Sequence, residues 1–167
     1  MDNDSRFELF TSILEKYRKY KPFNYDGEMY ISESGVIVVN CTDSRSLRKD
    51  HVSKYAAGHS SGYSHVIFIC NIGPASQAMM YLKTSPIRYE IFTLDEISYN
   101  PLAHYLSPVY EKIDSSCIEE PLENLFYVFE TDIIVRFYGF SCGDVLRGYY
   151  ARNPSKTFLR YVIEDRR

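Results

Sequence analysis

Histidine and cysteine are the residue types of this chain that could most readily bind a metal ion or act as nucleophiles. The 167-residue sequence contains four of each: His51, His59, His65 and His104, and Cys41, Cys70, Cys117 and Cys142. Zinc sites use short repeats such as HxxxH, HExxH or paired CxxC, and none of these spacings occurs. The scattered cysteines, with no secretory signal ahead of them, favour free thiols in a reducing compartment. We therefore expect no metal site and no cofactor.

Acidic residues could support a second kind of chemistry, the metal-dependent cleavage of a nucleic-acid strand. That reaction needs carboxylates which bind two cations and orient water, and in a nuclease-like α/β layer an E-x-K triplet on a central strand would supply them. The apolar runs at 36–39 and 65–70, which are the candidate central strands, contain no acidic residue. The residue types of Ser-His-Asp and Cys-His catalysis are present, but no recognisable nucleophile context surrounds them. The sequence therefore predicts no catalytic residue.

The composition is that of an ordinary soluble protein with a high aromatic content. Sixteen Tyr and ten Phe occur with no Trp, and the net charge is −3. Tyr suits both a β-sheet core and a surface half-buried against a partner, so both interpretations stay open. A negatively charged chain has no overall basic field that attracts nucleic acid, so any DNA contact needs a local patch. No apolar run approaches the roughly 20 residues of a membrane span, and we expect an intracellular protein without membrane contact.

The first half of the chain predicts an α/β layer. Strands are expected at the apolar runs 36–39 and 65–70 and at 88–94. Helices are expected at 5–20, at 44–55 with an end at 57–58, and at 75–82. Ser5 and Glu8 form a capping-box pattern, and Pro74 suits the first turn of the third helix. Asp43 is a candidate N-cap for the second helix. Alternating strands and helices are typical of a parallel sheet, so residues 1–95 are predicted to be an α/β domain with a short, mostly parallel sheet.

The second half predicts a small α+β domain over residues 96–167, which makes the overall fold class α+β. Pro101 and Pro108 favour a linker and short recognition segment at its start. Asp132 can cap a short helix, and Gly139 stands where the end of that helix needs a positive φ. The expected elements are the helical turn at 135–138, a tight turn at 140–144, and hairpin strands at 145–151 and 158–163 around a turn at 153–156.

The motif around that short helix resembles a known protein family. It reads Asp132-x-x-x-Arg136-Phe137-x-Gly139-x-x-x-Gly143-Asp144-Val145, followed by a hairpin that ends Phe158-x-x-Tyr161. This spacing resembles the assembly domain of the shared fifth subunit of eukaryotic nuclear RNA polymerases, whose archaeal counterpart is a smaller polymerase protein. Upstream, His104 and Pro108 resemble the family's H-x-L-V-P segment, and Gly73-Pro74-Ala75-Ser76 resembles the T-P-S-A turn of its jaw domain. The chain departs from the family pattern at Ile133, Tyr150 and Val162, and the last two stand where the family has arginine.

The resemblance implies a non-catalytic polymerase subunit, whose C-terminal domain docks on the largest subunit and whose N-terminal half forms part of a jaw near downstream DNA. The implied partner-binding residues are Asp132, Arg136, Phe137, Tyr138, Gly139, Gly143, Asp144, Tyr161, Pro74, His104 and Pro108. The basic residues expected near DNA phosphates are Lys16, Arg18, Lys19, Arg45, Arg48 and Lys49. The expected partners are the largest subunit, neighbouring small subunits and, weakly, downstream duplex DNA. The location would follow the polymerase: the nucleus for a cellular enzyme, or the host cytoplasm and virion for a viral one, which the shortened N-terminal half favours.

Other interpretations of the same residues stay open. Asp132 could simply cap the helix, Arg136 could pair with Asp132 one turn away, and the glycines could serve backbone geometry. Of the four motif aromatics, two are expected in the core rather than at an interface: Phe137, Tyr138, Tyr149 and Tyr161 are the candidates. At the level of function, the alternatives are a small α/β enzyme of degenerate nuclease type and a free-standing virion or scaffold protein.

Overall fold

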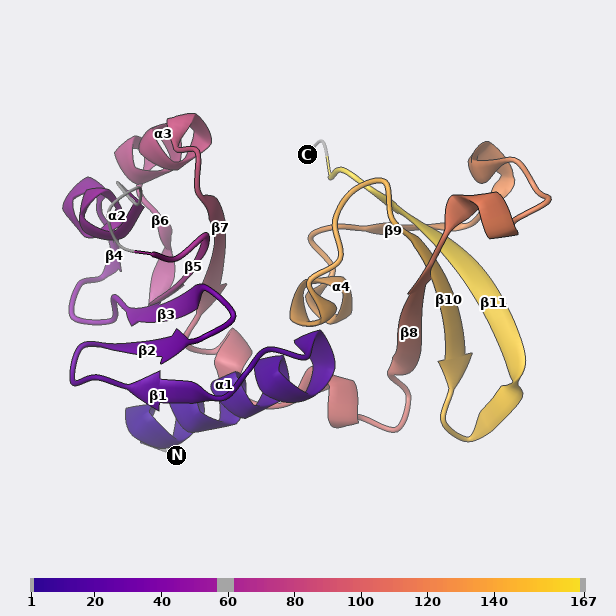
Figure 1. Ribbon diagram of the computed structural model, residues 1–167, viewed down its shortest axis with the longest axis horizontal. Coiled ribbons are helices and arrows are strands. Elements are labelled where there is room, and N and C mark those ends of the chain that lie inside the picture. The colour runs from indigo at the N-terminus through magenta and orange to yellow at the C-terminus, as the bar shows by residue number, and fades with distance from the viewer. Residues whose placement is uncertain (1, 57–61, 166–167) are drawn as a thin grey trace. The chain divides into compact units, whose positions relative to one another are not determined.

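The computed structural model describes residues 2–56 and 62–165, and the chain divides into two compact units, Met1–Tyr99 and Asn100–Arg167 (Figure 1). Each unit combines helices with a sheet, which confirms the predicted α+β class. The division falls after residue 99 rather than after 95, because the one-turn helix η1 (Glu96–Ser98) packs with the first unit through the fully buried Ile97. Within the described ranges, no helix has the length and apolar character that crossing a bilayer requires.

The described residues of the N-terminal unit form a five-stranded sheet in the order β1-β2-β3-β5-β7. These strands are β1 (Phe23–Tyr25), β2 (Met29–Ser32), β3 (Val36–Asn40), β5 (His65–Cys70) and β7 (Arg88–Thr93). The strands β3, β5 and β7 are parallel, as predicted, and β7 is the edge strand. Every residue of β5 is buried, because helices cover both faces of the sheet and a strand in that position has no solvent side.

The strands β1 and β2 form an antiparallel hairpin that was not predicted from the sequence. They contain three and four residues, which is too short for a clear alternation of apolar and polar positions. The available signal was the Asp26-Gly27 pair between two aromatic stretches, since this dipeptide favours tight hairpin turns. The Asp26 carboxylate accepts hydrogen bonds from the backbone N–H groups of Glu28 and Met29, both at 2.9 Å. β2 also pairs with β3, so the hairpin extends the sheet on one side.

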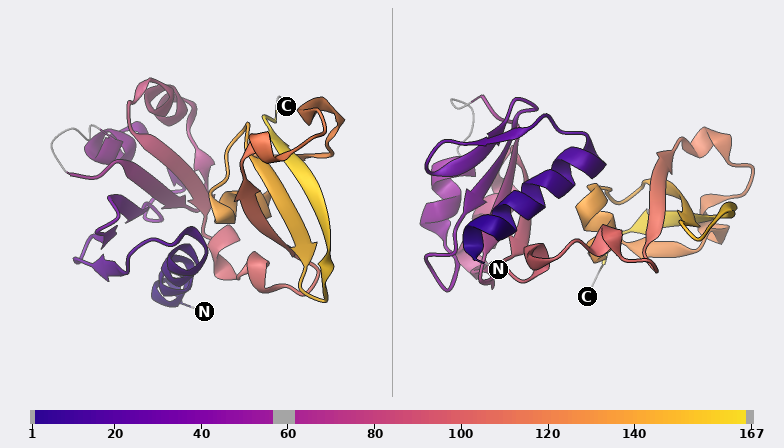
Figure 2. Two further views of the ribbon diagram at one scale, coloured as in Figure 1. Left: turned by 45° about the vertical axis from the view of Figure 1, so that its right-hand side comes forward. Right: turned by 90° about the horizontal axis from the view of Figure 1, so that it is seen from below.

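The first helix, α1 (Asn3–Arg18), covers one face of this sheet. Its N-cap is Asp2, whose carboxylate accepts the Ser5 N–H at 2.9 Å, so the predicted capping box at Ser5 is wrong. Because the Asp2 carboxylate already binds the Ser5 N–H, that N–H is not available to the Glu8 carboxylate, as a capping box would require. The helix contacts the sheet through apolar side chains such as Phe10, whose ring centroid lies 5.0 Å from that of Phe92. Figures 1 and 2 show α1 on the opposite side of the sheet from the other two long helices of the unit.

Those helices, α2 (Lys49–Ala56) and α3 (Ser76–Thr84), pack on a core of alternate residues from β3 and β5. Two short strands precede them, β4 (Ser46–Leu47) and β6 (Ile72–Pro74), which pair in parallel. Asp43 is therefore not an N-cap, and Pro74 lies in a strand rather than in the first turn of α3, because these positions are used in the extra strand pair. The predicted end of the second helix at residues 57–58 lies outside the described ranges.

The described part of the C-terminal unit forms a four-stranded sheet in the order β8-β10-β11-β9. Its strands are β8 (Pro108–Ile113), β9 (Tyr127–Phe129), β10 (Val145–Tyr150) and β11 (Asn153–Ile163). The hairpin of β10 and β11 is antiparallel, as predicted, but its turn lies at 151–152, because Tyr150 already pairs with Asn153. β8 forms an antiparallel edge beside β10, so the region predicted as a linker contains a strand after Pro108. A proline is tolerated there because it occupies the first position of an edge strand.

The short helix α4 (Ile133–Tyr138) packs on this sheet. Buried side chains from the helix and the strands form the core between them: Tyr110, Val135, Leu146 and Val162. The described part of the unit also contains the one-turn helices η2 (Pro101–Ala103), η3 (Ser115–Cys117) and η4 (Leu122–Asn124). The core is small and aromatic at its rim, where Tyr138 stacks on Phe140 with ring centroids 5.2 Å apart. The high Tyr and Phe content is thus partly explained by packing within this unit.

Candidate functional site

The motif residues form a short helix whose two ends are both fixed locally. The Asp132 carboxylate accepts the Ile134 N–H at 2.8 Å, which confirms Asp132 as the N-cap. Gly139 ends the helix with φ 76°, and its N–H donates to the carbonyl of Arg136 at 3.0 Å. A residue with a Cβ rarely adopts this left-handed conformation. The spacing of Asp132 and Gly139 therefore sets the length of α4.

The turn after α4 connects the helix to the sheet. Gly143 has φ 94°, and its N–H donates to the Val162 carbonyl on β11 at 2.9 Å. The Asp144 carboxylate accepts the Ser141 N–H at 2.9 Å and lies 2.6 Å from the Lys112 ammonium of β8. Asp144 thus closes its own turn and links it to the edge strand, so its role in this structure is to hold the motif in place.

The structure places the motif aromatics differently from one another. Phe137 has no exposed surface, so it cannot act as a surface anchor for a partner and is removed from the set of interface residues. Its position on α4 points the ring away from solvent, which the sequence could not show because α4 is only six residues long. Tyr138, Tyr149 and Tyr161 are partly buried. Val162, where the family has arginine, is fully buried and therefore cannot contact a partner.

Two further predicted partner-binding residues, His104 and Pro108, belong to the same unit as the motif. His104 is exposed, its ring centroid lies 4.8 Å from that of Tyr105, and its Nδ1 accepts the Leu106 N–H at 3.2 Å. The exposed fractions of Tyr105 and Leu106 are 70% and 46%. This turn lies between η2 and β8 and presents two large apolar side chains to solvent. Pro74 is half-buried in the other unit.

Five of the six basic residues predicted near DNA are exposed: Lys16, Lys19, Arg45, Arg48 and Lys49. They form two groups rather than one patch. Lys16 and Lys19 lie at the end of α1, whereas Arg45 lies just before β4 and Arg48 and Lys49 lie at the start of α2, across the sheet from α1 (Figure 2). Arg18 does not belong to either group. Its side chain is only 3% exposed, so the prediction that it faces DNA is wrong.

Arg18 instead belongs to a buried ionic cluster between α1 and the sheet. Its two terminal nitrogens lie 2.8 and 2.6 Å from the two carboxylate oxygens of Glu90 on β7. Nε2 of His65 lies 3.0 Å from Oε1 of the same carboxylate. The Tyr20 hydroxyl lies 3.4 Å from Nδ1 of His65. The bidentate contact between Arg18 and Glu90 is the strong form of an arginine–carboxylate pair, and it links α1 to the sheet.

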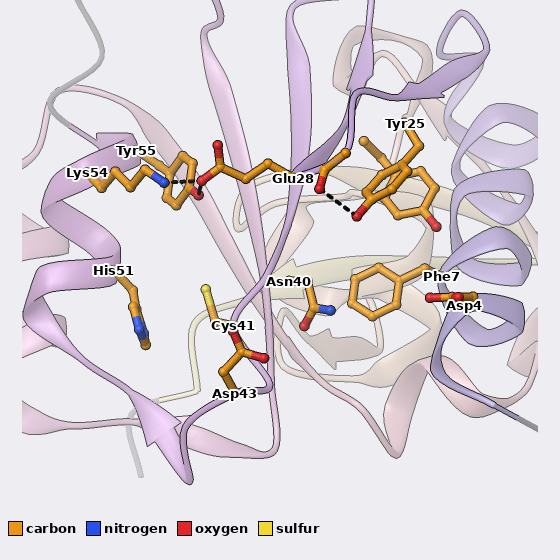
Figure 3. Close-up of a pocket in the computed structure, with 12 residues that line it drawn as sticks. Asp4, Phe7, Tyr25, Glu28, Asn40, Cys41, Asp43, His51, Lys54 and Tyr55 are labelled. Carbon is orange, nitrogen blue, oxygen red and sulfur yellow. Dashed lines mark hydrogen bonds and ion pairs between the residues drawn. The ribbon is translucent and has the colours of Figure 1, made fainter.

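A pocket of about 370 Å³ opens at the carboxyl end of β3, the end of a parallel strand where ligands commonly bind in α/β sheets. Figure 3 shows its polar side chains facing the cavity from α1, the β1–β2 hairpin, the residues after β3, and α2. Glu28 accepts a hydrogen bond from the Tyr55 hydroxyl at 2.6 Å and pairs with Lys54. No sequence pattern predicted this pocket, since its residues come from four elements. Its lining includes Asp4, Phe7, Tyr25, Glu28, Tyr30, Asn40, Cys41, Asp43, His51, Lys54 and Tyr55.

The chemistry of this pocket is limited. Within the described ranges, no group of three or more His, Cys, Asp or Glu side chains is arranged to hold a metal ion. Burial raises the pKa of the Cys41 thiol to about 12, so this thiol is protonated at neutral pH and is a poor nucleophile. The pocket therefore provides neither the two-cation carboxylate set of a nuclease nor an activated cysteine.

Comparison with known proteins gives no family assignment: no protein-family model matches the chain, and no curated protein matches it.

Proposed function

We propose that the chain is a non-catalytic subunit of a multisubunit DNA-directed RNA polymerase, and that its C-terminal unit docks on the largest subunit. The observation that supports this best is the structural coherence of the motif. The capped helix α4 and its turn into β10 form one structural element. Four motif residues hold this element in shape: Asp132, Gly139, Gly143 and Asp144. A motif whose spacing follows from one rigid element is suited to present the same surface to one partner. Nucleotidyl transfer would then be carried out by other chains.

Co-purification tests the docking role. A tagged full-length chain expressed in its native source should recover the largest polymerase subunit and neighbouring small subunits. Asp132→Ala removes the N-cap of α4, which costs about 1 kcal/mol and should lower the recovery about fivefold. Asp114→Ala is the matched control, because Asp114 caps η3 through the Ser116 N–H at 2.8 Å, outside the motif. Recovery should be unchanged in this control.

Two results would favour the alternatives. If the tagged chain recovers no polymerase subunit, the docking role is wrong and a free-standing scaffold protein becomes the better explanation. If the pure protein cleaves DNA in the presence of a divalent cation, and a substitution of Asp4 or Asp43 abolishes that activity, the chain is a nuclease that uses the pocket.

We expect DNA contact to be weak, and we expect only one of the two sets of exposed basic residues to contact DNA at a time. The two exposed groups lie over opposite faces of the sheet, so a straight duplex reaches the three residues Arg45, Arg48 and Lys49 or the two residues of α1. Each phosphate neutralised contributes about −0.9 to the slope of log K against log salt, so the slope should lie at about −2 to −3. Fluorescence anisotropy with a labelled duplex over a salt series measures it. A slope steeper than about −5 would contradict this arrangement and indicate one continuous basic surface.

A further inference from the structure

The outer edge of β11 is paired along only part of its length in the described structure. β11 runs from Asn153 to Ile163, and β10 pairs with one side of it. On the other side, β9 pairs in parallel with residues 161–163 alone. Figure 1 shows β9 as a short strand beside the much longer β11. The edge between Asn153 and Arg160 therefore has no neighbouring strand among the described residues.

Two hydrogen bonds show which backbone groups point to this edge. The Val162 N–H donates to the Asp144 carbonyl, just before β10, and the Tyr161 N–H donates to the Phe126 carbonyl, just before β9. Backbone groups alternate along a strand, so those of Leu159 and Thr157 point to the outer side, like those of Tyr161. The Leu159 carbonyl accepts a bond from the side chain of Arg160 at 3.1 Å. The Leu159 N–H and both backbone groups of Thr157 remain available to an added strand.

A hollow of about 580 Å³ lies beside this edge. It forms because the segment before β9 does not continue alongside β11. That segment contains the one-turn helix η4, and the chain enters β9 only after Leu125 and Phe126. The hollow has backbone and side chains of β11 on one wall and the segment before β9 on the other. Its lining is Glu120, Asn124, Leu125, Phe126, Tyr150, Thr157, Phe158, Leu159 and Arg160.

The β11 side of the hollow is basic and aromatic. The guanidinium of Arg160 lies 5.4 Å from the ring centroid of Phe126 and 4.8 Å from that of Phe158, so two aromatic faces hold it in place. Phe126 is 77% exposed. β11 also carries the exposed Lys156 and contains no acidic residue. An incoming strand with an acidic side chain opposite these positions would be favoured, since opposite charges across two strands attract.

The same charges disfavour a second copy of this chain as the occupant. An antiparallel pair of two β11 edges, centred between Thr157 and Leu159, would bring Lys156 of one copy close to Arg160 of the other. Like charges in facing positions destabilise a strand pair, and lysine on an edge strand commonly protects proteins from pairing with themselves. The occupant that fits the edge is an extended segment of a different protein.

We propose that an extended, acidic segment of a partner protein adds to the outer edge of β11 as a further strand, in line with β9. Main-chain hydrogen bonds to Thr157 and Leu159 would hold it, and Arg160 would recognise its carboxylate. The partner is taken to be the largest polymerase subunit, and that identification rests on the proposed function. This binding mode adds a specific site, β11, to the general docking role of the C-terminal unit.

Leu159→Pro tests the proposal in the tagged full-length chain, with polymerase from the native source as the probe. Proline removes the outward N–H of Leu159, and it leaves the bonds to β10 in place because that N–H does not face β10. Recovery of the largest subunit should fall about tenfold, the effect of about 1.4 kcal/mol. Leu159→Ala is the matched control, since it removes the same side chain and keeps the N–H, and its recovery should stay within about twofold of the unsubstituted chain.

Hydrogen exchange of the unsubstituted chain gives a second measurement that needs no variant. The amides of Thr157 and Leu159 should exchange rapidly in the free chain and slowly in the complex. If Leu159→Pro and the unsubstituted chain recover the polymerase equally and these amides stay unprotected, the edge-strand proposal is wrong while the proposed function stands. If neither chain recovers the polymerase, both are wrong. A homodimer that Leu159→Pro dissociates would also overturn the proposal, because the occupant would then be a second copy.

Discussion

Replacing Glu90 by alanine is expected to lower the free energy of unfolding by about 3–5 kcal/mol, the cost of leaving a buried charge without its partner. The substitution removes the carboxylate that contacts both Arg18 and His65, whose side chains are 3% and 5% exposed. The Arg18 guanidinium would remain between α1 and the sheet without its bidentate acceptor. Chemical denaturation followed by circular dichroism measures the change. The matched control is Glu33→Ala, because the Glu33–Lys21 pair is largely exposed and should contribute less than about 1 kcal/mol. A loss below that value for Glu90→Ala would show that the cluster does not stabilise the unit.

The same cluster gives the expected pH dependence of stability. Burial on its own would raise the pKa of Glu90, but its contact with His65 and the charge of Arg18 lower that pKa well below the ordinary value of 4.5. A carboxyl whose pKa is lower in the folded state stabilises the fold above its unfolded pKa and loses that contribution as the pH falls. Burial lowers the pKa of His65 below 6.5, despite Glu90, so acidification protonates the unfolded state first and again destabilises the fold. The stability difference between the unsubstituted chain and Glu90→Ala should therefore shrink as the pH is lowered through and below 4.5.

Gly148→Val is expected to destabilise the C-terminal unit by about 1–3 kcal/mol, the usual cost of adding atoms to a filled core. Gly148 lies in the middle of β10, directly between two aromatic rings. A Cβ atom at this position would lie 2.5 Å from Cε2 of Phe158 and 2.8 Å from Cε1 of Tyr110. These rings pack edge to face, with centroids 6.2 Å apart, so neither can move without disturbing the other. Thermal unfolding of the full chain measures the loss.

A second substitution separates this steric effect from a general loss of strand stability. Phe158→Leu removes part of the ring that a Cβ would meet, so the double variant should recover part of the stability lost in Gly148→Val. An additive result would mean that the two positions do not interact and that the proposed clash is wrong. Gly73→Ala is the comparison site, because a Cβ there meets no atom within 4 Å, and its effect should be small.

Local sequence signals predicted the device around α4 correctly. Asp132 as N-cap and Gly139 at positive φ need information from fewer than ten neighbouring residues, because capping bonds and backbone conformation are set within one or two helical turns. The parallel strands β3 and β5 were also predictable, since each is a continuous apolar run that must be covered on both faces. The motif spacing and the central sheet were therefore determined by the sequence itself.

Tertiary structure decided what the charged and edge residues do. Arg18 has the sequence context of an exposed basic helix end, yet it pairs with Glu90, 72 positions away in the chain. The open edge of β11 arises in the same way, since it depends on where β9 ends and the preceding chain turns aside. Pairings between distant segments follow from the packing of whole elements, which local patterns do not specify. For this reason the sequence determined the positions of strands such as β3, β5, β10 and β11 and of the helix α4, whereas the β1–β2 hairpin, the β4–β6 pair, the buried ion cluster, the pocket after β3 and the strand edge became visible only in the folded chain.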